Sequence, residues 1–159
     1  MLPSRHFTFG ILFALVLLFI FPKIGFIGFF LIVISTVVID VDHYLYYIFR
    51  KKNFSFRKFF DWVSNNGNVY SKLSEKQRKK IYFEICIFHG LETIFILFFI
   101  LLFSKSSFIL FILTGLIFHQ ALDLIDLIHL NINPCKVISL IYSVSYSKDK
   151  IFFGDYKLK

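Results

Sequence analysis

Histidine and carboxylate side chains recur inside the apolar stretches of this chain of 159 residues. Ionisable groups are costly in such stretches and are functional candidates for that reason. Neutral imidazole and carboxylate are common ligands of Zn²⁺, Mn²⁺ and Fe²⁺, and a divalent ion would offset the cost of burying several acids together. We therefore predict a site for one or two divalent ions, with zinc first and manganese or iron as alternatives. The candidate ligands are His6, Asp40, Asp42, His43, His89, His119 and Asp123.

Two more acids, Glu92 and Asp126, are candidates for general base catalysis. A bound ion with an open coordination position activates water as a nucleophile, and a carboxylate that is not a ligand can accept the proton. In a helix, His119, Asp123 and Asp126 lie on one stripe because they follow at intervals of four and three. His89 and Glu92 are three apart, so a helix there presents both on one face.

The Asp-x-Asp-His motif ends the second apolar segment. Asp40 and His43 are three apart and share a helix face, whereas Asp42 points away from that face if the helix continues. Measured from the outer ends of their segments at ~1.5 Å per residue, Asp40, His89 and His119 all lie about 18–24 Å deep. The outer halves of the segments are almost purely apolar, so we expect the site in the inner half of the membrane.

Four apolar segments must position these side chains, at about residues 6–21, 24–39, 81–103 and 107–130. The chain is 57% hydrophobic with a mean hydropathy of +0.72, more apolar than a soluble domain at about 45–50%. At ~1.5 Å per residue, the last two segments can cross a hydrocarbon core of about 30 Å, and the first two form a slightly shorter helical hairpin. The expected fold is all-α, a polytopic membrane protein of about four transmembrane helices.

The Lys and Arg residues are unevenly divided between the two sides of such a bundle. If the helices alternate in direction, sixteen of the 18 lie on the side of the central loop, about 44–80, and only Lys23 and Lys105 on the other. By the positive-inside rule, both chain termini and this loop are cytoplasmic, with the helices in the cell (inner) membrane. We expect a transmembrane helical domain over residues 1–130 and a basic cytoplasmic tail over residues 131–159. The net charge of +8 then reflects topology and anionic lipids, without nucleic acid as a partner.

The central loop has structure of its own. Aromatic and basic residues alternate over residues 54–63, which predicts an interfacial helix lying on the membrane surface. The Asn-Asn-Gly-Asn stretch at residues 65–68 is a turn signal. Ser74 and Gln77 form a capping box, which predicts that the third helix starts before the membrane.

Four sequence blocks in this order resemble a known pattern. They stand as His6-Phe-Thr-Phe-Gly10, Ile39-Asp40-Val41-Asp42-His43, Phe88-His89-Gly90-Leu91-Glu92 and His119-Gln120-Ala121-Leu122-Asp123. Over residues 6–126 the chain is similar to the predicted membrane-bound metal-dependent hydrolases of bacteria and archaea, and the resemblance implies that activity. Bacterial members have a fuller third block, His-Arg-Gly followed by Thr-His-Ser. This chain has His89-Gly90-Leu91-Glu92 there and lacks the arginine and the second histidine. Either Glu92 replaces the missing ligand or the site binds one metal fewer.

The leading hypothesis is a hydrolase at the inner membrane face, acting on a phosphoester or a lipid-linked ester. Basic residues and an aromatic surface segment around a site at headgroup depth suit an anionic amphiphile. A metal or proton transporter is a second interpretation, although the apolar outer half gives it no route across the membrane. A third is a non-catalytic integral membrane protein whose buried polar groups only hydrogen-bond between helices.

Overall fold

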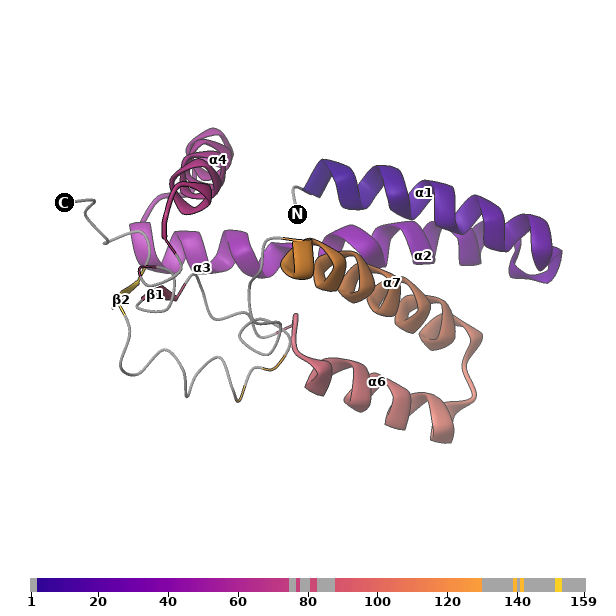
Figure 1. Ribbon diagram of the computed structural model, residues 1–159. Coiled ribbons are helices and arrows are strands. Elements are labelled where there is room, and N and C mark those ends of the chain that lie inside the picture. The colour runs from indigo at the N-terminus through magenta and orange to yellow at the C-terminus, as the bar shows by residue number, and fades with distance from the viewer. Residues whose placement is uncertain are drawn as a thin grey trace.

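The computed structural model describes residues 3–74, 77, 81–82, 88–129, 139, 141 and 151–152. Over these residues the secondary structure is helical, apart from one parallel pair of two-residue strands (Figure 1). This finding confirms the expected all-α class. The elements are α1 (Pro3–Ile20), η1 (Pro22–Ile24), α2 (Gly25–Val38), α3 (Val41–Lys51), α4 (Phe56–Ser71), β1 (Ile81–Tyr82), α6 (Leu91–Ser104), α7 (Ser107–His129) and β2 (Ile151–Phe152).

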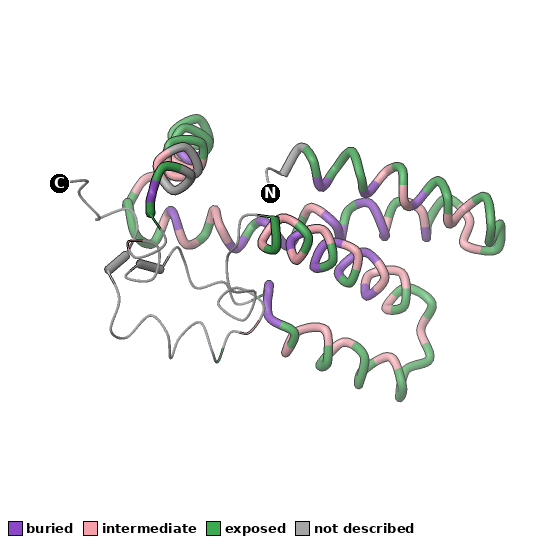
Figure 2. Tube along the Cα trace, viewed as in Figure 1, coloured by how far each residue is buried: buried purple, intermediate pink, exposed green. Residues whose placement is uncertain are grey.

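Four apolar helices, α1, α2, α6 and α7, form a bundle (Figure 1). α2 packs against both α1 and α7, and α6 packs against α7. In Figure 2 the buried positions of α2 and α7 lie where these two helices meet. Glycines make two of the contacts close, because Gly10 of α1 lies against Thr36, and Gly115 of α7 lies against Ser35 and the backbone of Ile32. α2 is therefore the helix around which the bundle is arranged.

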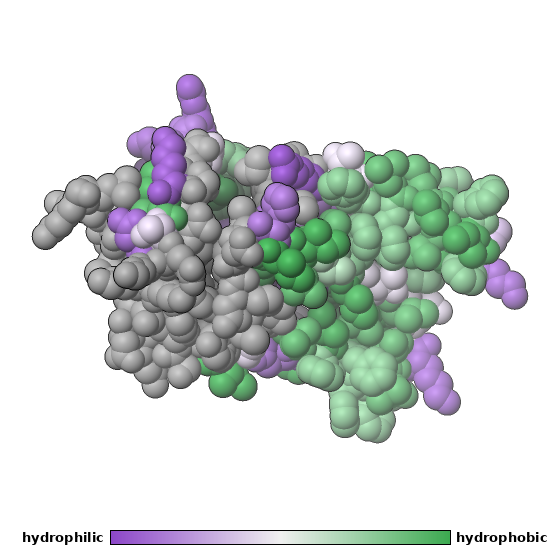
Figure 3. Space-filling model, viewed as in Figure 1, coloured by the Kyte–Doolittle hydropathy of each residue, from purple (hydrophilic) through white to green (hydrophobic). Residues whose placement is uncertain are grey.

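The outer surface of the bundle is apolar (Figure 3). Phe19 of α1, Phe26 of α2 and Phe103 of α6 are 88%, 77% and 78% exposed. Contiguous apolar surface of this kind marks a site that contacts lipid or another protein. Two helical stretches, Pro22–Lys51 and Ser107–His129, are long and apolar enough to cross a membrane, and α1 and α6 are shorter apolar helices.

The third apolar segment is a shorter helix than predicted. α6 begins at Leu91 rather than at residue 81, because Gly90 before it has an extended backbone with φ −76° and ψ 147°. The residues just before Gly90 form a turn, and the start of the predicted segment is in β1. The prediction that His89 and Glu92 share a helix face is therefore wrong, since His89 precedes the helix.

The second apolar segment matches its prediction closely and is then interrupted by a turn. α2 ends at Val38, the chain turns at Ile39 and Asp40, and α3 begins at Val41. α3 is followed by Lys52, whose φ of 51° is left-handed and ends the helix. The turn places the Asp-x-Asp-His motif across a helix junction instead of along one continuous helix.

A helix is present in the central loop, as predicted for residues 54–63. This helix, α4, also contains residues 65–68, so the predicted turn there is wrong. Tyr44 of α3 connects the two helices, because its hydroxyl donates to the carbonyl of Phe54 at 2.6 Å and its ring stacks on Phe56 at 4.3 Å. The position of α4 at a membrane surface stays a prediction.

The predicted capping box at Ser74 and Gln77 is confirmed. The amide of Ser74 donates to Oε1 of Gln77 at 2.9 Å, and the amide of Gln77 donates to Oγ of Ser74 at 3.4 Å. Most of the segment that follows, and most of the predicted tail over 131–159, lies outside the described residues.

Candidate metal centre

Six of the seven predicted ligands form two groups of three, which we call the first and second triads. The first triad is His6, His119 and Asp123, and the second triad is Asp40, His43 and His89. Within each triad, one donor atom from each residue lies within 4.8 Å of the others. Five separate elements supply these side chains: α1, the α2–α3 junction, α3, the turn before α6, and α7.

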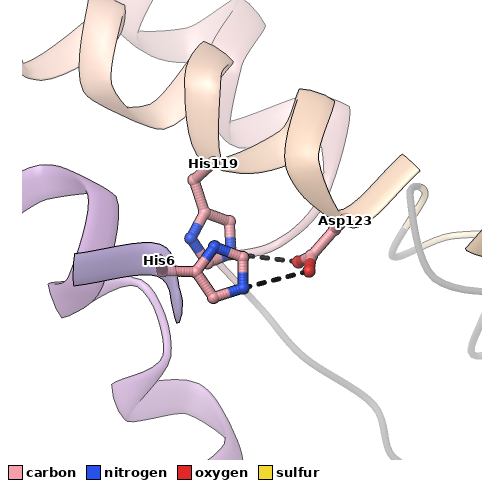
Figure 4. Close-up of side chains that lie close together, drawn as sticks. All are labelled: His6, His119 and Asp123. Carbon is pink, nitrogen blue, oxygen red and sulfur yellow. Dashed lines mark ion pairs between the residues drawn. The ribbon is translucent and has the colours of Figure 1, made fainter. Parts of the chain in front are cut away.

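The first triad is held together by the carboxylate of Asp123 (Figure 4). Its Oδ1 lies 3.2 Å from Nε2 of His6, and its Oδ2 lies 3.0 Å from Nε2 of His119. The two imidazole rings stack with their centroids 4.1 Å apart, and both residues are fully buried at 0% exposure. α1 and α7 therefore meet at a carboxylate that presents one oxygen to each imidazole.

The second triad lies at the turn between α2 and α3. Oδ1 of Asp40 lies 3.6 Å from Nε2 of His43 and 3.6 Å from Nε2 of His89. Asp40 and His89 are buried, whereas the side chain of His43 is 22% exposed. His43 is the most exposed of the seven predicted ligands, so the cluster opens toward solvent on its side.

The two triads are parts of one continuous cluster. Nε2 of His89 lies 3.2 Å from Nε2 of His119 and 3.9 Å from Oδ2 of Asp123. Nε2 of His119 also lies 3.9 Å from Oδ1 of Asp40. The donor atoms of these four residues, from three elements, thus lie within 3.9 Å of a neighbour in the other triad.

The two central histidines are oriented by hydrogen bonds from their outer nitrogens. Nδ1 of His119 donates to the carbonyl oxygen of Thr36 at 2.8 Å, and Nδ1 of His89 donates to Oδ2 of Asp42 at 3.4 Å. The Thr36 carbonyl and the Asp42 carboxylate can only accept, so in each neutral ring Nδ1 carries the proton. Nε2 then keeps a lone pair, which faces the cluster. Such a second contact fixes the tautomer and the ring orientation of metal-binding histidines.

Asp42 lies beside the site, and the condition under which it would point away, a helix that continues through residues 39–43, is not met. Because the helix is interrupted at residues 39–40, Asp42 is 5% exposed and lies behind His89. Its carboxylate also accepts the backbone N–H of Phe88. On the other side, Nε2 of Gln120 donates to the carbonyl oxygen of His89 at 2.5 Å. The backbone N–H of Phe88 and the carbonyl oxygen of His89 thereby hold the turn before α6 against α3 and α7.

Acceptor atoms dominate the inside of the cluster. Oδ2 of Asp40 and Nδ1 of His6 are buried and have no hydrogen-bond partner among the described residues. The carboxylates therefore create a negative potential at the centre, which favours a cation.

The two predicted general bases lie outside both triads. Oε1 of Glu92, in the first turn of α6, accepts from Oγ of Ser139 at 2.7 Å and from the amide of Ile141 at 3.4 Å. Asp126 is half-buried on α7, three residues beyond Asp123. A role in catalysis stays a prediction for both.

Sequence reasoning missed two groups that shape the site. Gln120 is a buried polar residue beside His119 in an apolar helix. Its type and position could have identified it as a site residue from the sequence. Thr36 was not detectable, because it contributes its backbone carbonyl to His119 while its hydroxyl donates to the carbonyl of Val33 at 2.7 Å.

The residues present fit a divalent transition metal. Three protein ligands of imidazole and carboxylate type with an open position are the usual set in catalytic zinc sites, and manganese and iron accept the same donors. The buried Asp40 oxygen without a partner is the kind of atom that a bound cation would satisfy. No family model, curated protein or solved structure matches this chain.

Proposed function

We propose that the protein is a metal-dependent hydrolase embedded in the cell (inner) membrane. The observation that carries the proposal is the convergence of four histidines and three aspartates, six of them buried, from separate elements of an apolar bundle. Burying so many carboxylates and imidazoles away from water is expensive in free energy. A bound zinc, manganese or iron ion is the compensation that this donor set favours.

The membrane location is supported by the apolar outer faces of α1, α2, α6 and α7. In this proposal the four helices are membrane spans, and both termini and α4 lie on the cytoplasmic side, where sixteen of the 18 basic residues fall. α6 has 14 residues and is about 21 Å long, shorter than the hydrocarbon core. The turn at His89 then lies inside the membrane, and its contacts with Asp42 and Gln120 satisfy the backbone groups that lipid cannot.

The chemistry follows from the open side of the cluster. A divalent ion held there polarises a scissile ester and makes water a stronger nucleophile. The triads would hold the ion, and Asp42 and the Thr36 carbonyl fix the imidazoles. The two candidate bases, Glu92 and Asp126, each follow a triad residue by three positions. Anionic lipids and a phosphoester or lipid-linked substrate suit the basic, aromatic side of the bundle where His43 is exposed.

Helix packing alone is the opposing interpretation, in which the polar cluster only joins α1, α2 and α7. It predicts that the folded protein holds no metal. A transporter needs ionisable groups along a path to the far side, and the buried polar residues of the described chain gather at the triad end of α2 and α7.

Metal content of the detergent-purified full chain separates these interpretations. Mass spectrometry should find near-stoichiometric zinc, manganese or iron in the wild type and its loss in folded His119→Ala and His89→Ala variants. His129→Ala is the matched control, because His129 is an exposed histidine at the end of the same helix. A wild-type protein that stays free of metal after reloading with each ion would refute the hydrolase and leave helix packing. A positive result leads to assays with phosphoester and lipid-ester substrates.

A further inference from the structure

We infer that the centre holds two neighbouring divalent ions, one bound by each triad, and that its substrate is a phosphate ester. This inference rests on the proposed metal-dependent function and adds the number of ions, their ligands and the substrate class. The first ion takes His6, His119 and Asp123, and the second takes Asp40, His43 and His89.

The first argument is the mutual repulsion of the donor atoms at the centre. Nε2 of His89 and Nε2 of His119 are 3.2 Å apart, and the outer nitrogen of each ring donates to an acceptor. In the neutral rings two lone pairs therefore face each other, with the carboxylate oxygens of Asp40 and Asp123 at 3.6–3.9 Å from Nε2 of His89. In the neutral form that metal binding requires, this set of acceptors is stable only around a cation.

The second argument is the number of ligands. A single tetrahedral ion uses four donors at most, and the four central atoms belong to His89, His119, Asp40 and Asp123. That arrangement leaves His6, a completely buried imidazole on α1, as a partner of Asp123 only and not as a ligand. Division into two triads uses all six residues and gives each ion three protein ligands and an open position, as in catalytic sites.

The third argument is the distance between the triads. Metal–ligand bonds to imidazole and carboxylate are about 2.0–2.2 Å long, and donor atoms of the two triads approach to 3.2 and 3.9 Å. Two ions bound by such neighbouring sets lie close enough to share one ligand, as in two-metal sites with a spacing of about 3.5–4 Å. Oδ2 of Asp123, in the first triad, lies 3.9 Å from Nε2 of His89, in the second triad.

Two adjacent ions favour phosphate esters over carboxylate esters, because they can bind both the attacking and the leaving oxygen of an in-line displacement. Water adds to phosphorus, the bond from phosphorus to the alcohol oxygen breaks, and the proton from water is transferred to the departing alcohol. Carboxylate esters require stabilisation of only one developing oxyanion, for which a single ion suffices.

Manganese loading of the full chain in detergent tests the inference without an activity assay. The wild type should bind about two manganese ions per chain, and its electron paramagnetic resonance spectrum should show an exchange-coupled pair. His43→Ala and His6→Ala each remove one ligand from a different triad and should each leave one ion with the resolved hyperfine lines of isolated Mn²⁺. His129→Ala should retain the coupled pair.

Each outcome tests a different part of the two-ion inference or of the proposed function. One ion per wild-type chain, or two ions without coupling, overturns the two-ion inference and leaves the metal-dependent function standing. No bound ion overturns both. The wild-type stoichiometry and spectrum decide the matter even where a variant fails to fold. Hydrolysis of carboxylate esters but not of phosphate esters by the loaded protein overturns the assigned substrate class.

Discussion

Replacing Gly115 with alanine should push α7 away from α2 and loosen the metal centre. A Cβ at this position would lie 2.5 Å from the backbone carbonyl oxygen of Ile32, where real contacts stay above 3.0 Å. It would also lie 1.9 Å from Oγ of Ser35, which can rotate away. The carbonyl oxygen of Ile32 cannot, so the helices must separate by at least 0.5 Å, the difference between 2.5 and 3.0 Å.

The separation reaches the site because His119 is one helical turn beyond Gly115. The bond from Nδ1 of His119 to the carbonyl of Thr36 is now 2.8 Å and would lengthen to about 3.3 Å, beyond the usual range of about 2.7–3.2 Å. Overpacking against backbone costs about 1–3 kcal/mol, and the higher helix propensity of alanine returns up to about 1 kcal/mol. We expect a net destabilisation of about 1–2 kcal/mol and metal affinity lower by about tenfold.

Gly28→Ala is the matched control, because the same change on α2 meets only side-chain atoms. Its Cβ would lie 2.5 Å from Cγ2 of Ile24 and 2.8 Å from the Phe111 ring, and both side chains can rotate. Thermal unfolding in detergent and zinc affinity by competition with a chromophoric chelator measure both effects. If Gly115→Ala has the same unfolding temperature and the same zinc affinity as the wild type, the contact between α2 and α7 does not position the site.

The remaining predictions concern the groups around the histidines and the ligands themselves. Asp42→Asn keeps the shape of the side chain but removes the charge behind His89, and it should weaken zinc binding by about 10–100-fold. The same change at the exposed Asp61 should have no effect. Equal zinc affinities of the two variants would contradict the role of Asp42 in orienting His89. Gln120→Leu leaves the buried carbonyl of His89 without its donor and should lower the free energy of unfolding by about 1–3 kcal/mol, whereas Thr114→Val on the exposed side of α7 should change stability little. Metal retention should fall as the pH is lowered from about 8 to about 5, because imidazole must be neutral to bind a metal. Dialysis at each pH followed by metal analysis measures this retention. Full retention at the lowest pH would show that histidines are not the ligands.

Two helices followed from local pattern and agree closely with the structure. The first apolar segment, predicted over residues 6–21, is α1, and the fourth, predicted over residues 107–130, is α7. Both are long continuous apolar runs, which form helices whatever their neighbours are. The third segment is equally apolar, but residues 81–82 and 88–90 within it are not helical, and the turn before Gly90 is held by contacts with Asp42 and Gln120 from other elements.

The sequence alone determined which side chains belong to the cluster. Spacing along α7 and equal depth in the apolar segments depend only on helix geometry, and they were enough to select all seven His and Asp residues. What only the tertiary structure decided is how these residues pair: His6 with Asp123, His89 with Asp40, and Asp42 behind His89. These pairings depend on the interruption of the helix at residues 39–40 and on the close approach of α7 at Gly115. Neither a local interruption nor the register of two packed helices is fixed by periodicity along one chain.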